Sequence, residues 1–137
     1  MEASAKQFRK RNAILECLRQ TREHPGAETV YAMLRQEHPD ISLATVYRNL
    51  ALFKSQGLIM SVGTVKGVER FDGNPVPHAH FICTGCDAVI DLPGVDPPEG
   101  LCEAATRDVG GRVAECHLTF TGVCGQCMNA PPGGEPA

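Results

Sequence analysis

Two cysteine pairs constrain this 137-residue chain more than any other feature. Cys83-x-x-Cys86 and Cys124-x-x-Cys127 are separated by 37 residues. A two-residue spacing lets both sulfurs of a pair face one ion, and two pairs complete the tetrahedral shell that Zn²⁺ prefers. We therefore predict a structural zinc site. The alternatives are a thioredoxin-type redox pair, which the glycines and turn character of both pairs disfavour, and an iron–sulfur cluster. The three remaining cysteines are expected to be buried: Cys17, Cys102 and Cys116.

The long gap between the pairs requires a strand–helix–strand excursion. The stretch from 97 to 111 predicts a helix with Leu101, Ala105 and Val109 facing inward, ended by Gly110-Gly111. An α/β module of about sixty residues is small for independent stability, so it is expected to need a metal, a partner subunit or both. Alternating or apolar segments predict three strands, at residues 78–83, 87–92 and 112–124.

The histidines of this region point to a second kind of site. If residues 78–83 form a strand, His78 and His80 project from one face and Cys83 from the other. Two imidazoles at this spacing form half of a site for a divalent metal, and Asp72 and Asp91 would add oxygen ligands. Mixed nitrogen and oxygen ligands suit Fe²⁺ or Mn²⁺. The alternative is a pair of ordinary surface histidines beside a capping aspartate.

The first half of the chain has a helical pattern followed by a hairpin pattern. Helices are predicted at 4–22, at 27–37 and after Ser42, with Gly57 ending the third. The third carries a single buried stripe of Leu43, Val46, Leu50 and Phe53. Residues 58–72 predict two short strands around Gly63–Gly67. This order is that of a winged helix-turn-helix, whose third helix reads DNA.

The distribution of charged residues agrees with a DNA-binding module in the first half of the chain. Residues 1–70 hold 11 Lys/Arg against 7 Asp/Glu, a net +4, whereas residues 71–137 hold 2 against 9, a net −7. A basic module for DNA fits this imbalance, and a soluble protein with uneven surfaces is the alternative. The residues expected to contact bases or phosphates are Arg11, Ser42, Thr45, Tyr47, Arg48, Lys54 and Lys66.

The overall layout is expected to be α+β. We predict a winged-helix DNA-binding domain at 1–73, a hinge at 74–77, a dimerisation and metal-binding domain at 78–128 and a disordered tail at 129–137. No apolar run approaches 18 residues, and the N-terminus lacks the apolar core of a signal peptide. A cytoplasmic protein without a membrane partner or an organic substrate is therefore expected.

In combination, these motifs resemble the ferric uptake regulator family of bacterial metal-dependent repressors. The resemblance extends over roughly residues 8–127, in matching order. It is carried by HPGAETVY (24–31), SLATVYRNLALFKSQGLI (42–59), RFDG (70–73), HAHFICTGCDAVIDL (78–92) and GVCGQC (122–127).

The resemblance implies a homodimer that binds an inverted-repeat operator, a Cys₄ zinc and a regulatory Fe²⁺ or Mn²⁺. Family members that sense peroxide typically have aspartate at the position of Asp91, where iron-uptake regulators have glutamate. In such members Fe²⁺ and peroxide oxidise a histidine ligand, which matches His24 or His78, and Mn²⁺ supports repression without that chemistry. The regulatory ligands that match are His24, Asp72, His78, His80 and Asp91.

Other functions remain open from the sequence. The chain would otherwise be an iron or zinc uptake regulator of the same family, or, more remotely, a metal-dependent hydrolase rather than a non-enzymatic repressor. Many members have a further metal site, but its positions correspond here to Pro77, Ala79 and Cys116, so that site is expected to be absent. His117 is expected to be a solvated strand residue.

Overall fold

The structure is a computed structural model that describes residues 2–129. It divides into two compact units, residues 1–76 and 77–137. The expected disordered tail lies outside the described residues except for Asn129, which caps a short helix. Within the described part of the chain, no helix combines the length and apolar character needed to cross a membrane.

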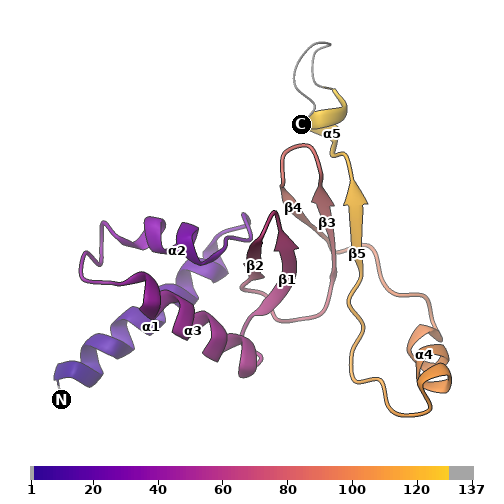
Figure 1. Ribbon diagram of the computed structural model, residues 1–137, viewed down its shortest axis with the longest axis horizontal. Coiled ribbons are helices and arrows are strands. Elements are labelled where there is room, and N and C mark those ends of the chain that lie inside the picture. The colour runs from indigo at the N-terminus through magenta and orange to yellow at the C-terminus, as the bar shows by residue number, and fades with distance from the viewer. Residues whose placement is uncertain (1, 130–137) are drawn as a thin grey trace. The chain divides into compact units, whose positions relative to one another are not determined.

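The first unit consists of three helices and a two-stranded antiparallel hairpin (Figure 1), the arrangement predicted for a winged helix-turn-helix. The first helix begins two residues before the predicted position, and the second ends three residues early. The elements are α1 (Glu2–Gln20), α2 (Ala27–Leu34), α3 (Leu43–Ser55), β1 (Met60–Val65) and β2 (Val68–Asp72).

Helix α3 has the boundaries that its sequence indicates. Ser42 caps it, because its Oγ accepts a hydrogen bond from the backbone N–H of Thr45 at 3.1 Å, an interaction worth about 1 kcal/mol. Gly57 follows the helix with φ of +74°, the left-handed conformation that favours glycine. The predicted stripe packs inward, with Leu43 only half-buried. The core of the unit contains Ile14, Leu18, Ala27, Val30, Ile41, Val46, Leu50, Phe53, Ile59 and Phe71.

The turn of the hairpin is shorter than the one expected. Lys66 and Gly67 both have positive φ, 50° and 80°, and form a tight two-residue turn between β1 and β2. Gly63 lies inside β1, where the pairing register shifts between Ser61 and Gly63. The prediction of a turn over Gly63–Gly67 was therefore too long, because Gly63 accommodates a bulge rather than a turn.

The second unit is a three-stranded sheet with the order β4-β3-β5. Strand β3 pairs antiparallel with β4 and parallel with β5, and helix α4 lies on the connection between β4 and β5. The last strand is much shorter than predicted, so His117 precedes it and the expectation of a strand residue was wrong. The elements are β3 (Ala79–Cys83), β4 (Val89–Leu92), α4 (Leu101–Val109), β5 (Thr119–Gly122) and α5 (Gly125–Met128).

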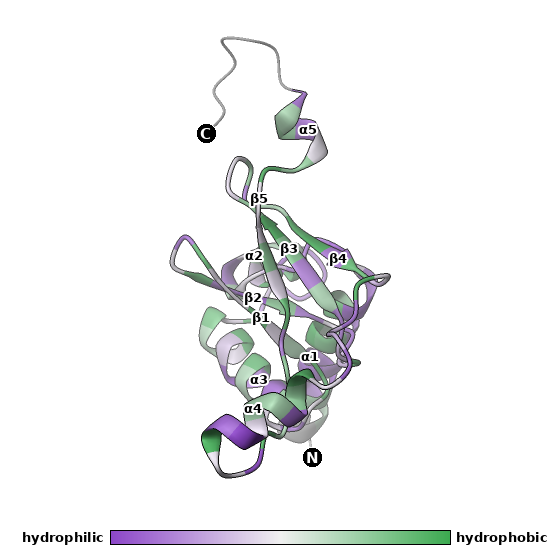
Figure 2. Cartoon of the chain, turned by 90° about the vertical axis from the view of Figure 1, so that its right-hand side faces the viewer, coloured by the Kyte–Doolittle hydropathy of each residue, from purple (hydrophilic) through white to green (hydrophobic). Residues whose placement is uncertain are grey.

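Helix α4 ends before Gly110 as predicted, but it begins only at Leu101 and does not have the predicted burial. Leu101 is 38% exposed and Val109 is 69% exposed, and Ala105 is exposed as well. Figure 2 shows apolar and polar segments side by side along this helix. The apolar side chains of α4 therefore do not enter the core of their own unit, since a single chain offers them no complementary surface.

Gly73 provides a test of how tightly the chain is held after β2. A Cβ at this position would lie 2.5 Å from the backbone carbonyl carbon and oxygen of Leu18, so α1 and this segment cannot both stay in place. We expect Gly73→Ala to lower the free energy of unfolding by about 1–3 kcal/mol, measured by urea denaturation. Gly94→Ala is the matched control, because a Cβ there meets nothing within 4 Å. Equal midpoints for the two variants would contradict the close approach.

Candidate metal centres and nucleic-acid interface

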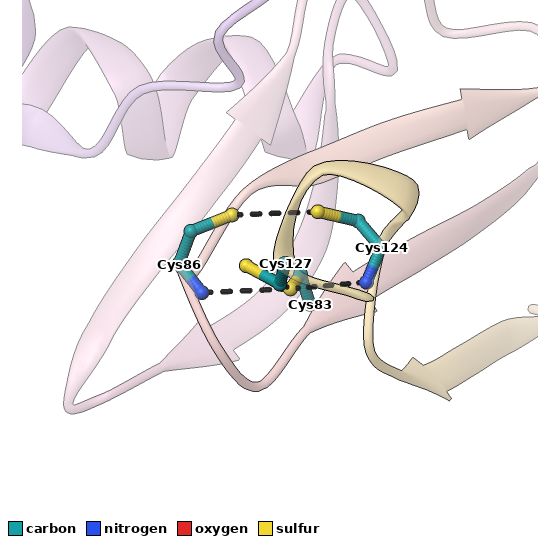
Figure 3. A group of neighbouring side chains, drawn as sticks. All are labelled: Cys83, Cys86, Cys124 and Cys127. Atoms are coloured by element: carbon teal, nitrogen blue, oxygen red, sulfur yellow. Dashed lines mark hydrogen bonds between the residues drawn. The ribbon is translucent and has the colours of Figure 1, made fainter. Parts of the chain in front are cut away.

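The four paired cysteines of the second unit form one cluster (Figure 3). Their sulfur atoms all lie within 4.8 Å of one another. The separations are 3.7 Å between Cys83 and Cys127 and 3.8 Å between Cys86 and Cys124. Four sulfurs placed at the usual zinc–sulfur distance around a tetrahedral ion would be separated by about 3.8 Å. The thiol set therefore fits a structural Zn²⁺, as the spacing predicts.

The backbone around the cluster is arranged to support thiolates. The N–H groups of Cys124, Cys86 and Gly85 point at Cys83 Sγ from 3.3 to 3.4 Å, and they lower the pKa of the Cys83 thiol to about 6. Hydrogen bonds with Cys83 and then Cys124 raise the pKa of Cys127 to about 12. One thiolate therefore forms readily and the next is opposed, so a bound cation is needed to hold four thiolates together.

The close packing around the sulfurs excludes a larger residue at Gly85. A Cβ there would lie 2.8 Å from Cys127 Sγ. The second pair differs from the prediction, because Cys124 caps α5 and Cys127 lies within it. That pair does open a short helix after a strand, as a thioredoxin-type pair would. All four sulfurs nevertheless share one cluster, which favours a metal shell over a redox pair.

The single cysteines are more exposed than expected. Cys102 is exposed on α4, so the prediction of burial was wrong for this residue. Cys17 and Cys116 are half-buried. Burial raises the pKa of the Cys17 thiol, with the charge of Glu23 adding to the effect.

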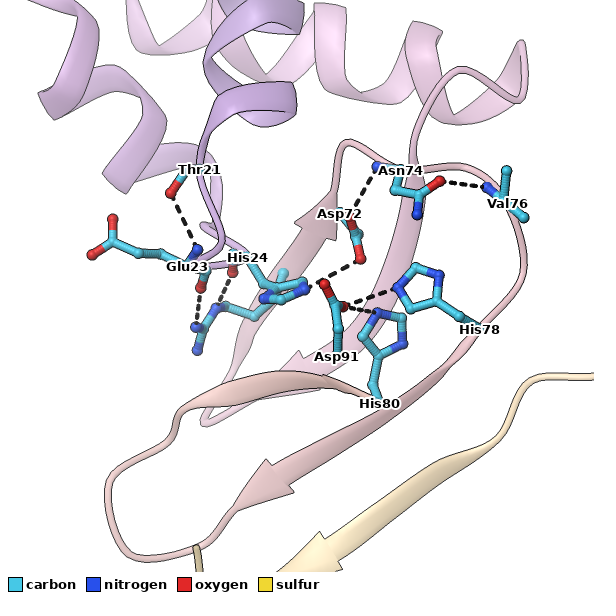
Figure 4. A network of polar contacts seen from close by, with 10 residues as sticks. Thr21, Glu23, His24, Asp72, Asn74, Val76, His78, His80 and Asp91 are labelled. Carbon is cyan, nitrogen blue, oxygen red and sulfur yellow. Dashed lines mark hydrogen bonds and ion pairs between the residues drawn. The ribbon is translucent and has the colours of Figure 1, made fainter. Parts of the chain in front are cut away.

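In the first unit, a histidine and an aspartate from distant positions form a close pair (Figure 4). Nε2 of His24, in the connection between α1 and α2, lies 3.2 Å from Oδ2 of Asp72 at the end of β2. Asp72 Oδ1 accepts a hydrogen bond from the backbone N–H of Asn74 at 2.9 Å. One carboxylate oxygen is thus fixed by the backbone while the other faces the imidazole, an arrangement that suits a metal ligand.

The backbone of His24 is held by β2. His24 has φ of 52°, a conformation that costs a non-glycine residue free energy and persists only where surrounding contacts enforce it. The guanidinium of Arg70 donates to the carbonyls of both His24 and Glu23. The N–H of Phe71 donates to the Pro25 carbonyl at 3.1 Å. Sequence patterns did not identify the role of Arg70, because that role depends on β2 packing beside the connection between α1 and α2.

The second unit contributes two histidines and an aspartate. Register places His80 of β3 directly opposite Asp91 of β4, so both side chains share one face of the sheet. Asp91 Oδ1 lies 2.9 Å from Nε2 of His78 and 3.1 Å from Nε2 of His80. The centroids of the imidazole rings of His78 and His80 are 4.3 Å apart. The predicted convergence of these three side chains is therefore present within this unit, as Figure 4 also shows.

His117 remains apart from these groups. Its Nε2 lies 3.5 Å from Glu115 Oε2, and its side chain is 54% exposed.

The solvent-exposed face of α3 carries Tyr47 and Arg48, two of the residues predicted to contact DNA. Tyr47 is 55% exposed and Arg48 is exposed, with Ala44 and Ala51 on the same face. Arg48 donates to Thr45 Oγ1 at 3.3 Å. Small residues around one phenol and one guanidinium permit close approach to a groove.

Arg11 and Lys54, both expected to contact phosphate, have side-chain partners within the first unit. Arg11 Nε donates to Asn49 Oδ1 at 3.0 Å, and Asn49 is buried. Lys54 Nζ lies 2.8 Å from Glu69 Oε2. Lys66 stands at the tip of the hairpin. Sequence patterns missed Asn49 and Glu69, because neither has a spacing that indicates its partner.

The cysteine cluster predicts a selective loss of zinc. We expect Cys124→Ser protein to retain less than about a tenth of the zinc of the wild type after a chelator wash, because a closed tetrahedral site then lacks one of its four thiolates. Elemental analysis of the washed protein measures this. Cys102→Ser is the control and should keep its zinc, since Cys102 lies outside the cluster. Retention of zinc by Cys124→Ser would contradict the four-thiolate site.

Comparison with known proteins agrees with these features. The chain is 37% identical over 119 residues to the peroxide operon regulator of Bacillus subtilis, covering 85% of this chain and 80% of that protein. It is 34% identical over 119 residues to the peroxide-responsive repressor PerR of Staphylococcus epidermidis, covering 85% and 77%. The crystal structure of the Campylobacter jejuni peroxide stress regulator superposes with a TM-score of 0.76 at 28% identity, covering 92% of this chain and 94% of the other. The model of the ferric uptake regulator family matches residues 2–121, and with its winged helix and α+β architecture the chain belongs to that family.

Proposed function

We propose that this protein is a dimeric, metal-dependent DNA-binding repressor that senses hydrogen peroxide. The observation that carries the proposal is the pair of ligand groups of the same chemistry, one in each unit. His24 and Asp72 are poised in the first unit, and His78, His80 and Asp91 converge in the second. The similarity to peroxide regulators supports the choice of signal.

A single regulatory ion would take ligands from both groups. Neither group alone supplies the five or six donors that Fe²⁺ or Mn²⁺ commonly takes with nitrogen and oxygen ligands. The backbone contacts of Arg70 and Asn74 keep His24 and Asp72 in place without the ion. Joining the groups would select one arrangement of the segment 74–77 and so favour the DNA-binding state of the dimer.

DNA binding is assigned to the first unit. The exposed face of α3 would enter the major groove, with Tyr47 and Arg48 reaching base edges or phosphates. Ser42 and Thr45 fix the start of the helix, and Lys66 at the tip of the hairpin would meet the backbone. Arg11 and Lys54 complete the proposed phosphate contacts.

Loss of a ligand is the proposed response to peroxide. Bound Fe²⁺ would supply the electron that cleaves the oxygen–oxygen bond of hydrogen peroxide. The iron would regain this electron when the oxidised imidazole loses an electron and a proton, so the net change replaces one imidazole C–H bond by a C–O bond and releases water. Oxidation of His24 or His78 would remove a ligand and release the DNA. A non-enzymatic regulator in the cytoplasm is proposed over a hydrolase. The carboxylate of Asp91 contacts both imidazoles through Oδ1, which is the position of a further metal ligand. A hydrolase would instead need a carboxylate placed to act as a general base on a metal-bound water.

Dependence on Mn²⁺ tests the repressor proposal. Protein with zinc in the cysteine cluster should select specific duplexes from a random-sequence pool in the presence of Mn²⁺. Its affinity for the selected operator should fall about 5- to 150-fold when Mn²⁺ is removed, the range of a coupling of 1–3 kcal/mol. Gel shifts measure the affinity, and elemental analysis checks that zinc content stays constant. His80→Ala should keep its zinc and lose the response to Mn²⁺. Equal binding by the zinc-only protein would refute the regulatory site.

Hydrogen peroxide should covalently modify specific histidines. We expect Fe²⁺-loaded protein treated with hydrogen peroxide to gain about 16 Da, one oxygen atom, on a peptide that contains His24 or His78. Peptide mass spectrometry measures the gain, and Mn²⁺-loaded protein is the control that should remain unmodified. If the mass is unchanged and operator binding persists, the chain is instead a metal-uptake regulator of the same family.

A further inference from the structure

Strand β2 presents two side chains to His24 from one of its faces. Arg70 and Asp72 are two positions apart, so both project to the same side of the strand. Asp72 meets the imidazole of His24, whereas the guanidinium of Arg70 donates to its backbone carbonyl. Phe71 lies between them and belongs to the core of the unit. One ligand of the proposed metal site is thus held both by its side chain and by its backbone.

The guanidinium of Arg70 uses two of its nitrogens for this contact. Nε donates to the carbonyl of His24, and Nη2 donates to the carbonyl of Glu23 at 2.9 Å. The planar fork of arginine can serve two adjacent carbonyls at once, whereas the ammonium of lysine acts as a point charge. Hydrogen bonds from a charged donor are also stronger than those between neutral groups. The two bonds therefore restrain the backbone on both sides of the peptide that joins Glu23 to His24.

His24 needs such a restraint because its backbone conformation is unfavourable. Its φ of 52° costs a residue with a Cβ free energy and persists only where neighbouring groups enforce it. Without Arg70, the connection would relax toward conformations in which the imidazole no longer faces Asp72. A bound ion would then have to restore the unfavourable conformation. Its apparent affinity would fall by the fraction of molecules that already have that conformation.

Neighbouring contacts keep the rest of the connection on β2. The N–H of Phe71 donates to the Pro25 carbonyl at 3.1 Å. A Cβ at Gly26 would collide with the side chain of Val68, so the two segments lie in close contact there as well. Arg70 itself is half-buried and lies outside the hydrophobic core. Loss of its side chain is therefore expected to act locally, on His24, while the unit stays folded.

We propose that Arg70 is a positioning residue for the regulatory metal, which sets the affinity of the site by holding His24 in its ligand conformation. The proposal rests on the regulatory site proposed above. Electrostatics alone predicts an effect of the opposite sign. A fixed positive charge near the ligands repels a divalent cation, so its removal would tighten binding. Positioning predicts instead that removal of Arg70 weakens binding, and the sign of the change decides between the two.

Titration with Co²⁺, which accepts the same nitrogen and oxygen ligands, tests this role. With zinc retained in the cysteine cluster and no DNA present, we expect Arg70→Met to bind Co²⁺ about 10- to 100-fold more weakly than the wild type. This is the range for residues that orient a metal ligand. Visible absorption measures the affinity, and elemental analysis checks that the zinc content is unchanged. Arg35→Met is the matched control and should bind Co²⁺ within about twofold of the wild type, because it removes the same charge from an exposed position of the same unit.

A double-mutant cycle with His24→Ala tests whether Arg70 acts through His24. In the His24→Ala background, Arg70→Met should change the affinity for Co²⁺ by less than about twofold, because the ligand that Arg70 positions is already missing. A substitution that merely weakened the fold would lower the affinity equally in both backgrounds, and that result would contradict the positioning role.

The metal-free form, with zinc only in the cysteine cluster, provides a readout that does not involve the regulatory ion. We expect the amide hydrogen of Phe71 to exchange with solvent about tenfold faster in Arg70→Met, because its bond to the Pro25 carbonyl loses the adjacent support of Arg70. The amide of Leu50, in the buried part of α3, should exchange as in the wild type. Hydrogen exchange followed by NMR measures both rates. Equal acceleration at both amides would indicate a general loss of stability and would overturn the positioning role.

The outcomes distinguish the role of Arg70 from the underlying function. Wild-type protein that binds no Co²⁺ beyond its cysteine cluster would overturn both proposals. Binding of Co²⁺ that His24→Ala weakens, together with equal or tighter binding by Arg70→Met, would overturn only the role of Arg70.

Discussion

The cluster of four thiols is the interaction on which the second unit depends. Among the described residues of this unit, only Ala79, Cys83 and Val89 are buried apolar residues, which is too little to stabilise a domain of this size by itself. The cluster joins the end of β3 to the helical turn after β5, two segments separated by about forty residues. Binding of zinc to such a site contributes directly to folding. This closure holds β5 beside β3, and the separate pairing of β3 with β4 places His80 opposite Asp91.

The first unit is organised in the opposite way, around a hydrophobic core. Helices α1, α2 and α3 each bury apolar residues, and Ile59, just before β1, and Phe71 of β2 add to this core. The return of β2 along the connection between α1 and α2 then fixes polar groups: Arg70 holds the backbone of His24, and Asp72 meets its imidazole. Packing of a core thus positions metal ligands in one unit, whereas a metal site supports the sheet in the other. This difference explains why the proposed regulatory ion can act on a preformed group of ligands.

Exposed apolar groups on the second unit are consistent with a dimer. Phe120 lies on the edge strand β5 at 43% exposure, and Val109 of α4 is more exposed still. Members of this family are dimeric repressors, so a second copy of the chain would bury such side chains. The error in the predicted burial of α4 has the same origin, because the amphipathic pattern shows that a face is covered but not whether its own chain covers it.

Local patterns in the amino-acid sequence predicted the three helices and the hairpin, the cap at Ser42, the end of α3 at Gly57, the metal-binding spacing of the two cysteine pairs, and the placement of His80 and Cys83 on opposite faces of a strand. These features follow from local spacing, dihedral preference and the alternation of strands, which need no knowledge of distant neighbours. The contacts of Arg70 with His24, of Asn49 with Arg11 and of Glu69 with Lys54 become visible only in the folded chain. Those contacts join residues 15 to 46 positions apart, and no local pattern encodes them because the partners meet only once the core has packed.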